Sequence, residues 1–125
     1  MATEENLKKA FSGESQASRK YLAFAIKAME EGYPEIAQLF LEAAGAESIH
    51  AVNHLKVMGV VKSTKENLKE AAEGENFEIE EMYPKFIEEA EREGRHDAAK
   101  SFRIAMEREK QHREMFREAL RKLEG

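Results

Sequence analysis

Hydrophobic residues recur every three or four positions along most of the chain, which is the spacing of one face of an α-helix. Glycines, prolines and capping residues divide this pattern into four long segments. The predicted helices run from near Thr3, as the cap, to about Glu31, from Pro34 to about Val57–Gly59, from Ser63 or Thr64 to about Glu93, and from Asp97 or just before it to Leu123. The sequence therefore predicts an all-α protein whose short turns make neighbouring helices antiparallel.

One proline lies inside the third predicted helix. Pro84 follows Tyr83, well away from either end of that segment. A proline in a helix interior removes a backbone donor and crowds the preceding turn. We therefore expect a kink there, just beyond Glu75 and Glu78.

The two halves of the chain repeat one pattern. Leu7–Glu14 aligns with Leu68–Glu75. After one inserted residue in the second half, Ala37–Phe40 aligns with Ala99–Phe102, and this longer offset then continues along the chain. The chain is thus predicted to be a duplicated helical hairpin, and its four helices to form a bundle.

Charged residues interrupt the apolar stripes at matching positions in both halves. These residues are Glu14, Glu47 and His50 in the first half and Glu75, Glu109 and His112 in the second. Each Glu-x-x-His pair lies on one helical face, because three residues are about one turn. Buried carboxylates without partners are costly and repel one another. One glutamate from each of two helices and Glu-x-x-His from the other two is a dinuclear metal pattern, so two metal ions are predicted.

The Glu-x-x-His motif alone is only moderate evidence for a metal site, because glutamate fills 24 of 125 positions. Chance predicts fewer than one such pair, and three occur. The third pair, Glu93 and His96, straddles a glycine in a predicted turn, and we expect it at the surface. His54, one turn beyond His50, is expected at the surface or behind a ligand. Glu78, three residues after Glu75, fits either an additional carboxylate ligand or a surface residue.

Charge and composition narrow the function classes. The net charge of −5 and the lack of a basic block argue against a general nucleic-acid binder. No cysteine is present, which excludes disulfides, thiolate zinc sites and cysteine-ligated iron–sulfur centres within this chain. Uncharged stretches such as Tyr21–Ile26 are too short to span a membrane, and nothing resembles a signal peptide. A soluble cytoplasmic protein is expected.

The chain resembles the rubrerythrins, non-haem di-iron peroxidases, over essentially its whole length. The motifs that carry the resemblance are Gly13-Glu14-Ser15-Gln16-Ala17 with Arg19 and Tyr21, Ala46-Glu47-Ser48-Ile49-His50-Ala51, Gly74-Glu75-Asn76-Phe77-Glu78 with Glu81-Met82-Tyr83-Pro84, and Glu109-Lys110-Gln111-His112. Ferritins and bacterioferritins share the bundle but lack the doubled carboxylate before Met-Tyr-Pro. The resemblance implies one ferritin-like domain over residues 1–125, in a homodimer, with helices kept within one chain or exchanged between two.

The resemblance also implies roles for individual residues. Glu47 and Glu109 would bridge two irons, Glu14 would bind one of them, and Glu75 with His112 would bind the other. His50 in the reduced state and Glu78 in the oxidised state would alternate on the first iron. Tyr21 and Tyr83 resemble hydroxyl donors to the ligand carboxylates.

Charge balance supports this exchange independently. The five glutamates carry five negative charges, whereas two ferrous ions carry four positive charges and two ferric ions carry six. Carboxylate suits the harder ferric ion and neutral imidazole the ferrous ion, so Glu78 is expected to bind on oxidation. The same donor atoms also accept zinc or manganese as substitutes for iron.

The function that the resemblance implies is reduction of hydrogen peroxide to water in oxidative-stress defence. The chain has no cysteines for the rubredoxin-like domain of many relatives, so it looks like the short, sulerythrin-like type. A separate electron donor, such as a rubredoxin, would then be needed. Two alternatives remain open: a ferroxidase or metal-handling protein, and a helical interaction module without metal.

Overall fold

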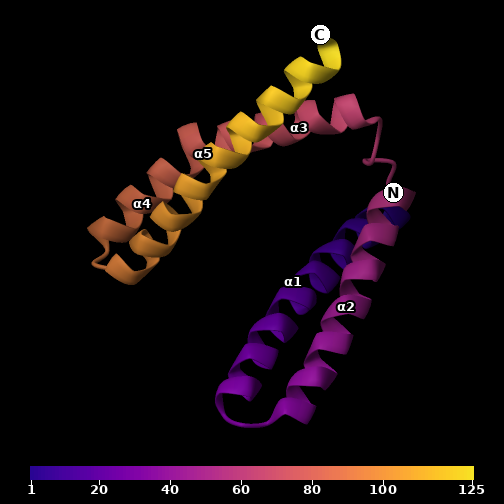
Figure 1. Ribbon diagram of the computed structural model, residues 1–125, viewed down its shortest axis with the longest axis vertical. Helices are drawn as coiled ribbons and strands as arrows, with labels where there is room; N and C mark the ends of the chain where they lie inside the picture. The colour runs from indigo at the N-terminus through magenta and orange to yellow at the C-terminus, as the bar shows by residue number, and fades with distance from the viewer. The chain divides into compact units, whose positions relative to one another are not determined.

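The computed structural model describes all 125 residues, and these form helices joined by short turns (Figure 1). The helices are α1 (Ala2–Glu30), α2 (Pro34–Val57), α3 (Thr64–Phe77), the π-helix η1 (Glu78–Met82), α4 (Tyr83–Arg92) and α5 (His96–Glu124). The four predicted segments are present, the third of them as α3, η1 and α4, and the all-α prediction is confirmed. No helix combines the length and apolar character needed to cross a membrane.

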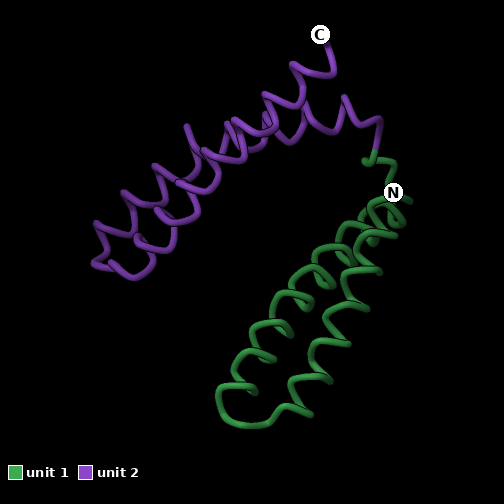
Figure 2. The backbone as a smooth tube through the Cα atoms, viewed as in Figure 1, with its two compact units in different colours: residues 1–61 green, residues 62–125 purple.

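The chain divides into two compact units, Met1–Val61 and Lys62–Gly125 (Figure 2). In the first unit α1 packs along α2, and in the second α5 packs along α3, η1 and α4. Each unit is thus a helical hairpin, in agreement with the predicted duplication. The assignment of residues 1–125 to a single domain stays a prediction.

The same turn closes both hairpins. Gly32 and Gly94 have φ values of +83° and +75°, a conformation that favours glycine. In each turn the next residue donates its backbone N–H to the carbonyl of a buried alanine, Ala28 or Ala90, at 2.8 Å. This is the hydrogen bond of a Schellman motif, and it satisfies a carbonyl that the helix end leaves free.

Each hairpin buries mostly small side chains where its helices touch. The buried residues are Ser18, Ala25, Ala28, Ala37, Ala44 and Ala51 in the first hairpin and Ala72, Ile79, Ala90 and Ala99 in the second. An aromatic triad packs beside this seam in each hairpin: Tyr21, Phe24 and Phe40, or Tyr83, Phe86 and Phe102. The triads occupy equivalent positions of the repeat, and the two phenylalanine centroids are 5.5 Å apart in both. The repeat therefore extends to packing.

The helix starts differ from prediction at one place. Met1 is the N-cap of α1, so Thr3 lies inside the first turn and its prediction as the cap is wrong. The acidic residues Glu4 and Glu5 occupy that turn, where the helix dipole favours negative charge. The cap of α3 is Ser63, one of the two predicted candidates, and it forms a capping box with Glu66.

A kink was predicted near Pro84, and the structure has a π-helical turn directly before this proline. The offset between the halves is one position longer at Tyr21 and Tyr83 than at Glu14 and Glu75, so the inserted residue lies between these positions. The π-helix occupies this interval. A π-turn contains one more residue than an α-turn, so it absorbs the insertion without disturbing the helix on either side.

Candidate metal centre

The first hairpin gathers three of the predicted ligands on one face. Glu14 comes from α1, and Glu47 and His50 come from adjacent turns of α2. One ligand atom from each residue lies within 4.8 Å of the other two. Nδ1 of His50 is 3.2 Å from Oε1 of Glu14, with the His50 side chain 51% exposed and Glu14 26% exposed. The cluster is therefore half-buried and accessible from the imidazole side.

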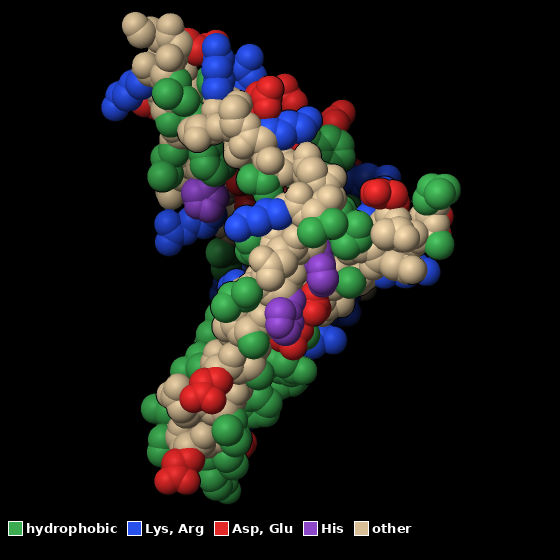
Figure 3. Space-filling view, turned by 90° about the vertical axis from the view of Figure 1, so that its right-hand side faces the viewer, with side chains coloured by type: hydrophobic (Ala, Val, Ile, Leu, Met, Phe, Trp, Pro, Cys, Tyr) green, Lys and Arg blue, Asp and Glu red, His purple; other side chains and the backbone are tan.

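The second hairpin repeats the arrangement. Glu75 comes from α3, and Glu109 and His112 come from α5, with their ligand atoms again within 4.8 Å. Nδ1 of His112 is 3.7 Å from Oε1 of Glu75. Histidine side chains lie beside acidic ones on the surface shown in Figure 3. Both halves of the chain thus bring the same three residue types together.

These residues fit a metal ion. Oε2 of Glu75 and Oε2 of Glu109 are buried without a hydrogen-bond partner, whereas Oε2 of Glu14 lies beside Nε2 of His54. Unpaired buried carboxylate oxygens are costly, and a bound cation removes that cost. Two carboxylates and one imidazole in each cluster are a ligand set for iron, manganese or zinc. Metal binding by these six residues stays a prediction that this geometry supports.

The remaining candidates lie outside the two clusters. Glu78 is on η1, half-buried, and belongs to neither group of three. Tyr21 and Tyr83 belong to the aromatic triads, and their hydroxyl roles stay predictions. His96 was predicted to lie at the surface, and it is exposed there in contact with Glu91.

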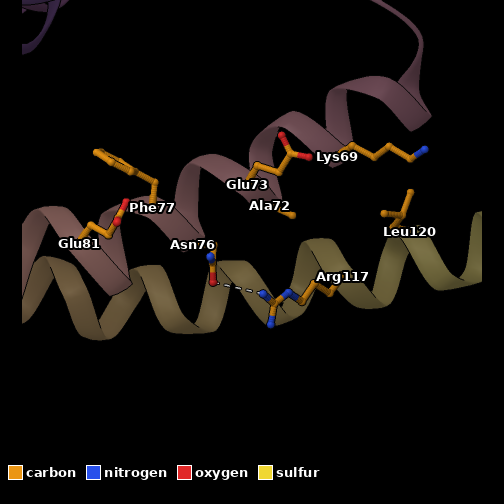
Figure 4. A pocket seen from close by; sticks show the side chains of 8 residues that line it. All are labelled: Lys69, Ala72, Glu73, Asn76, Phe77, Glu81, Arg117 and Leu120. Carbon is orange, nitrogen blue, oxygen red and sulfur yellow. Dashed lines mark hydrogen bonds between the residues drawn. The ribbon is translucent and has the colours of Figure 1, made fainter.

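Two arginines that the sequence did not single out lie beside the π-helix. Nη1 of Arg113 donates to the side-chain oxygen of Asn76 at 2.9 Å and to Glu80 at 3.1 Å. Arg117 also donates to Asn76, at 3.3 Å (Figure 4). These contacts join α5 to the helix on both sides of Glu78. A signal was available, because the equivalent positions of the first half are the apolar Ala51 and Leu55.

A partly buried serine pair joins the helices of the first hairpin. Ser18 of α1 and Ser48 of α2 share a hydrogen bond between their hydroxyls at 2.7 Å. Ser48 is adjacent to Glu47 in the chain, so this bond fixes α2 against α1 beside the first cluster. This pair was not predicted from the sequence.

Comparisons with known proteins agree in their family. The Rubrerythrin family model matches residues 5–120. Rubrerythrin-1 of Clostridium acetobutylicum is 37% identical, with 98% of this chain and 71% of that protein covered. Rubrerythrin of Porphyromonas gingivalis is 41% identical, with 88% of this chain and 62% of that protein covered. Among solved structures, fully reduced, all-ferrous nigerythrin matches with a TM-score of 0.51 and 36% identity, over 98% of this chain and 68% of that one.

Proposed function

We propose, from the premise that this chain belongs to the rubrerythrin family, that it is a di-iron peroxidase that reduces hydrogen peroxide to water. The observation that carries the proposal is the pair of matching Glu–Glu–His clusters, one in each hairpin. The all-ferrous state named for the nigerythrin structure supports iron as the metal. Oxidative-stress defence is the corresponding physiological task.

The proposed ligands divide between the hairpins. On this proposal Glu47 and Glu109 would bind both irons, Glu14 would bind one of them, and Glu75 with His112 would bind the other. Two bound ferrous ions would supply the two electrons that reduction of hydrogen peroxide requires, and two protons would complete the two molecules of water. Zinc or manganese would occupy the same donors without necessarily supporting this chemistry.

Glu78 and His50 are proposed to alternate on one iron. Glu78 lies on the π-helix, a short interruption of the α-helical segment of a kind that is frequent at functional sites. His50 is the half-exposed member of its cluster, with contact to a single carboxylate oxygen. Both placements favour side chains that can move. Tyr21 and Tyr83 would orient the ligand carboxylates by hydrogen bonding.

The electrons that restore the reduced state are proposed to come from a separate protein, such as a rubredoxin. This chain has no cysteine with which to bind a rubredoxin-type iron.

We also propose that the chain acts as a homodimer. Large apolar side chains such as Phe24, Leu39 and Ile49 are exposed on the helices. This exposure supports packing of these helices against the helices of a second copy of the chain.

Anaerobic reduction followed by one equivalent of peroxide per iron pair tests the proposal. Rapid reoxidation with two electrons consumed per peroxide is the expected result. The competing function is a ferroxidase, because the same ligands would also bind ferrous iron. Preference for oxygen with continuing iron uptake would establish that function instead, and a protein that binds no metal would exclude both.

A further inference from the structure

One difference between the two hairpins lies one turn beyond the ligand histidine of each. The repeat pairs Glu47 with Glu109 and His50 with His112. One turn further along each helix the same register pairs His54 with Phe116. The first hairpin therefore has a second imidazole where the second hairpin has a hydrocarbon ring.

His54 lies against the ligand carboxylate of its hairpin. Its Nε2 is 2.5 Å from Oε2 of Glu14, and Nδ1 of His50 is 3.2 Å from the other oxygen, Oε1. Oε2 of Glu14 nevertheless has no hydrogen-bond partner. The ring N–H of His54 therefore does not point at this oxygen. Rotation of the ring about its bond to Cβ would turn Nε2–H toward that oxygen. His54 is 28% exposed, and it is not part of the three-residue cluster.

In the second hairpin a phenylalanine stands in the place of His54. The Phe116 ring packs on the His112 ring with centroids 6.4 Å apart. Glu75 contacts His112 through Oε1 alone, and its Oε2 is buried without a partner. Glu14 thus has a nitrogen beside each oxygen, whereas Glu75 has a nitrogen beside only one.

We propose that His54 is a positioning residue for Glu14 and makes the two metal positions of this chain inequivalent. Donation from Nε2 to Oε2 holds the Glu14 carboxylate so that Oε1 remains available to the metal. Glu75 has no such donor, so its carboxylate is free to bind through one oxygen or both. Groups that fix metal ligands in this way typically contribute a factor of about 10–100 in metal affinity.

This inference rests on the proposed metal centre but not on peroxidase activity. The test is titration of the full-length protein with Co²⁺, with chelator competition for the stepwise affinities and visible absorption for the ligand field. The variants are His54→Phe, which copies the second hairpin, His54→Gln, which keeps an N–H donor, and Phe116→His, which copies the first hairpin.

His54→Phe is expected to weaken one of two Co²⁺ steps by about 10–100-fold and to change its absorption spectrum, while the other step is unchanged. His54→Gln should recover part of the loss, and Phe116→His should strengthen the other step. The inference is overturned if His54→Phe leaves both steps unchanged or weakens them equally, or if His54→Gln is as weak as His54→Phe. Phe116→His keeps the test open if substitution of His54 prevents folding, and an effect on neither step would then overturn the inference.

The outcomes separate this inference from the proposed function. Wild-type protein that binds no Co²⁺ would overturn the metal centre as well as the role of His54. Two Co²⁺ steps that are insensitive to His54 would overturn only the positioning role. Steps that respond to His54 in a protein that does not consume peroxide when loaded with iron would overturn only the peroxidase.

Discussion

The Arg113 guanidinium of α5 donates to the side-chain oxygen of Asn76, at the end of α3, across 2.9 Å. The same nitrogen reaches Glu80 on the π-helix at 3.1 Å. Asn76 and Glu80 flank Glu78 in the chain, so Arg113 connects α5 to side chains on both sides of the proposed mobile ligand. The equivalent position in the first hairpin, which has no π-turn, is Ala51. The arginine accompanies the insertion.

Replacing Arg113 by methionine removes both bonds and keeps much of the aliphatic stem. We expect the free energy of unfolding to fall by about 1–3 kcal/mol, because Arg113 and Asn76 are partly buried. Chemical denaturation of the intact protein measures the change. The control is Arg121→Met, since Arg121 and its partner Glu118 are exposed neighbours on one helix, and a change within about 0.5 kcal/mol is expected. Equal losses in the two variants would contradict the role of Arg113.

The stability of the protein is expected to depend on pH through Asp97, at the start of α5. Arg95 donates to the Asp97 carboxylate, and this hydrogen bond, the backbone N–H of Ala98 and the charge of Arg95 lower the pKa of Asp97. A carboxyl whose pKa is lower in the folded state contributes stability above its unfolded pKa of about 3.9. That contribution disappears as the pH falls through the folded pKa.

Asp97→Asn should therefore lower the melting temperature slightly at neutral pH, with the difference vanishing in acid. Thermal melts of both proteins between pH 2 and pH 7, about the range spanned by carboxyl titration, measure this. The control is Glu42→Gln, since Glu42 is exposed in the middle of α2. A difference of the same size at every pH would show that the Asp97 charge is not responsible.

The sequence was sufficient to predict the helices, their hairpin duplication and the residues in the two clusters. Apolar periodicity and glycines such as Gly32 and Gly94 are local signals, and both correspond to the observed helix ends. The matching of Glu47 to Glu109 identified pairs that a bare motif search would have mixed with Glu93 and His96. Repetition added information that single-residue propensities lack.

Other features depended on contacts that periodicity does not encode. A one-residue change of offset shows that an insertion exists, but Pro84 alone suggested a kink rather than a π-turn. The contact between Arg113 and Asn76 depends on how α5 packs against α3, and charged residues are frequent all along this chain. The contact between His54 and Glu14 likewise depends on how closely α2 packs against α1, and the sequence does not give that distance.

Loss of either proposed shared ligand should empty the centre. Glu47→Ala or Glu109→Ala removes a carboxylate that would serve both ions, so both metals are expected to be lost or bound much more weakly. Metal content after exchange into metal-free buffer, with stepwise Co²⁺ titration, measures the effect. Glu107→Ala is the matched control, because Glu107 is exposed two residues from Glu109 and forms only an ion pair with Lys110. Retention of two metals in Glu109→Ala would exclude the shared-ligand role.

Glu78→Ala should separate metal binding from turnover. The six residues of the two clusters remain in this variant, so two metals are expected to stay bound. Peroxide turnover should fall, because the ferric state loses the carboxylate that balances its additional charge. Stopped-flow reoxidation of the reduced protein by peroxide, together with metal analysis of the same sample, measures both quantities. Glu81→Ala on the same π-helix is the control, since Glu81 is exposed, and its turnover should match that of the wild type. If Glu78→Ala turns over peroxide as fast as that control, Glu78 does not exchange with His50, whatever metal the clusters hold.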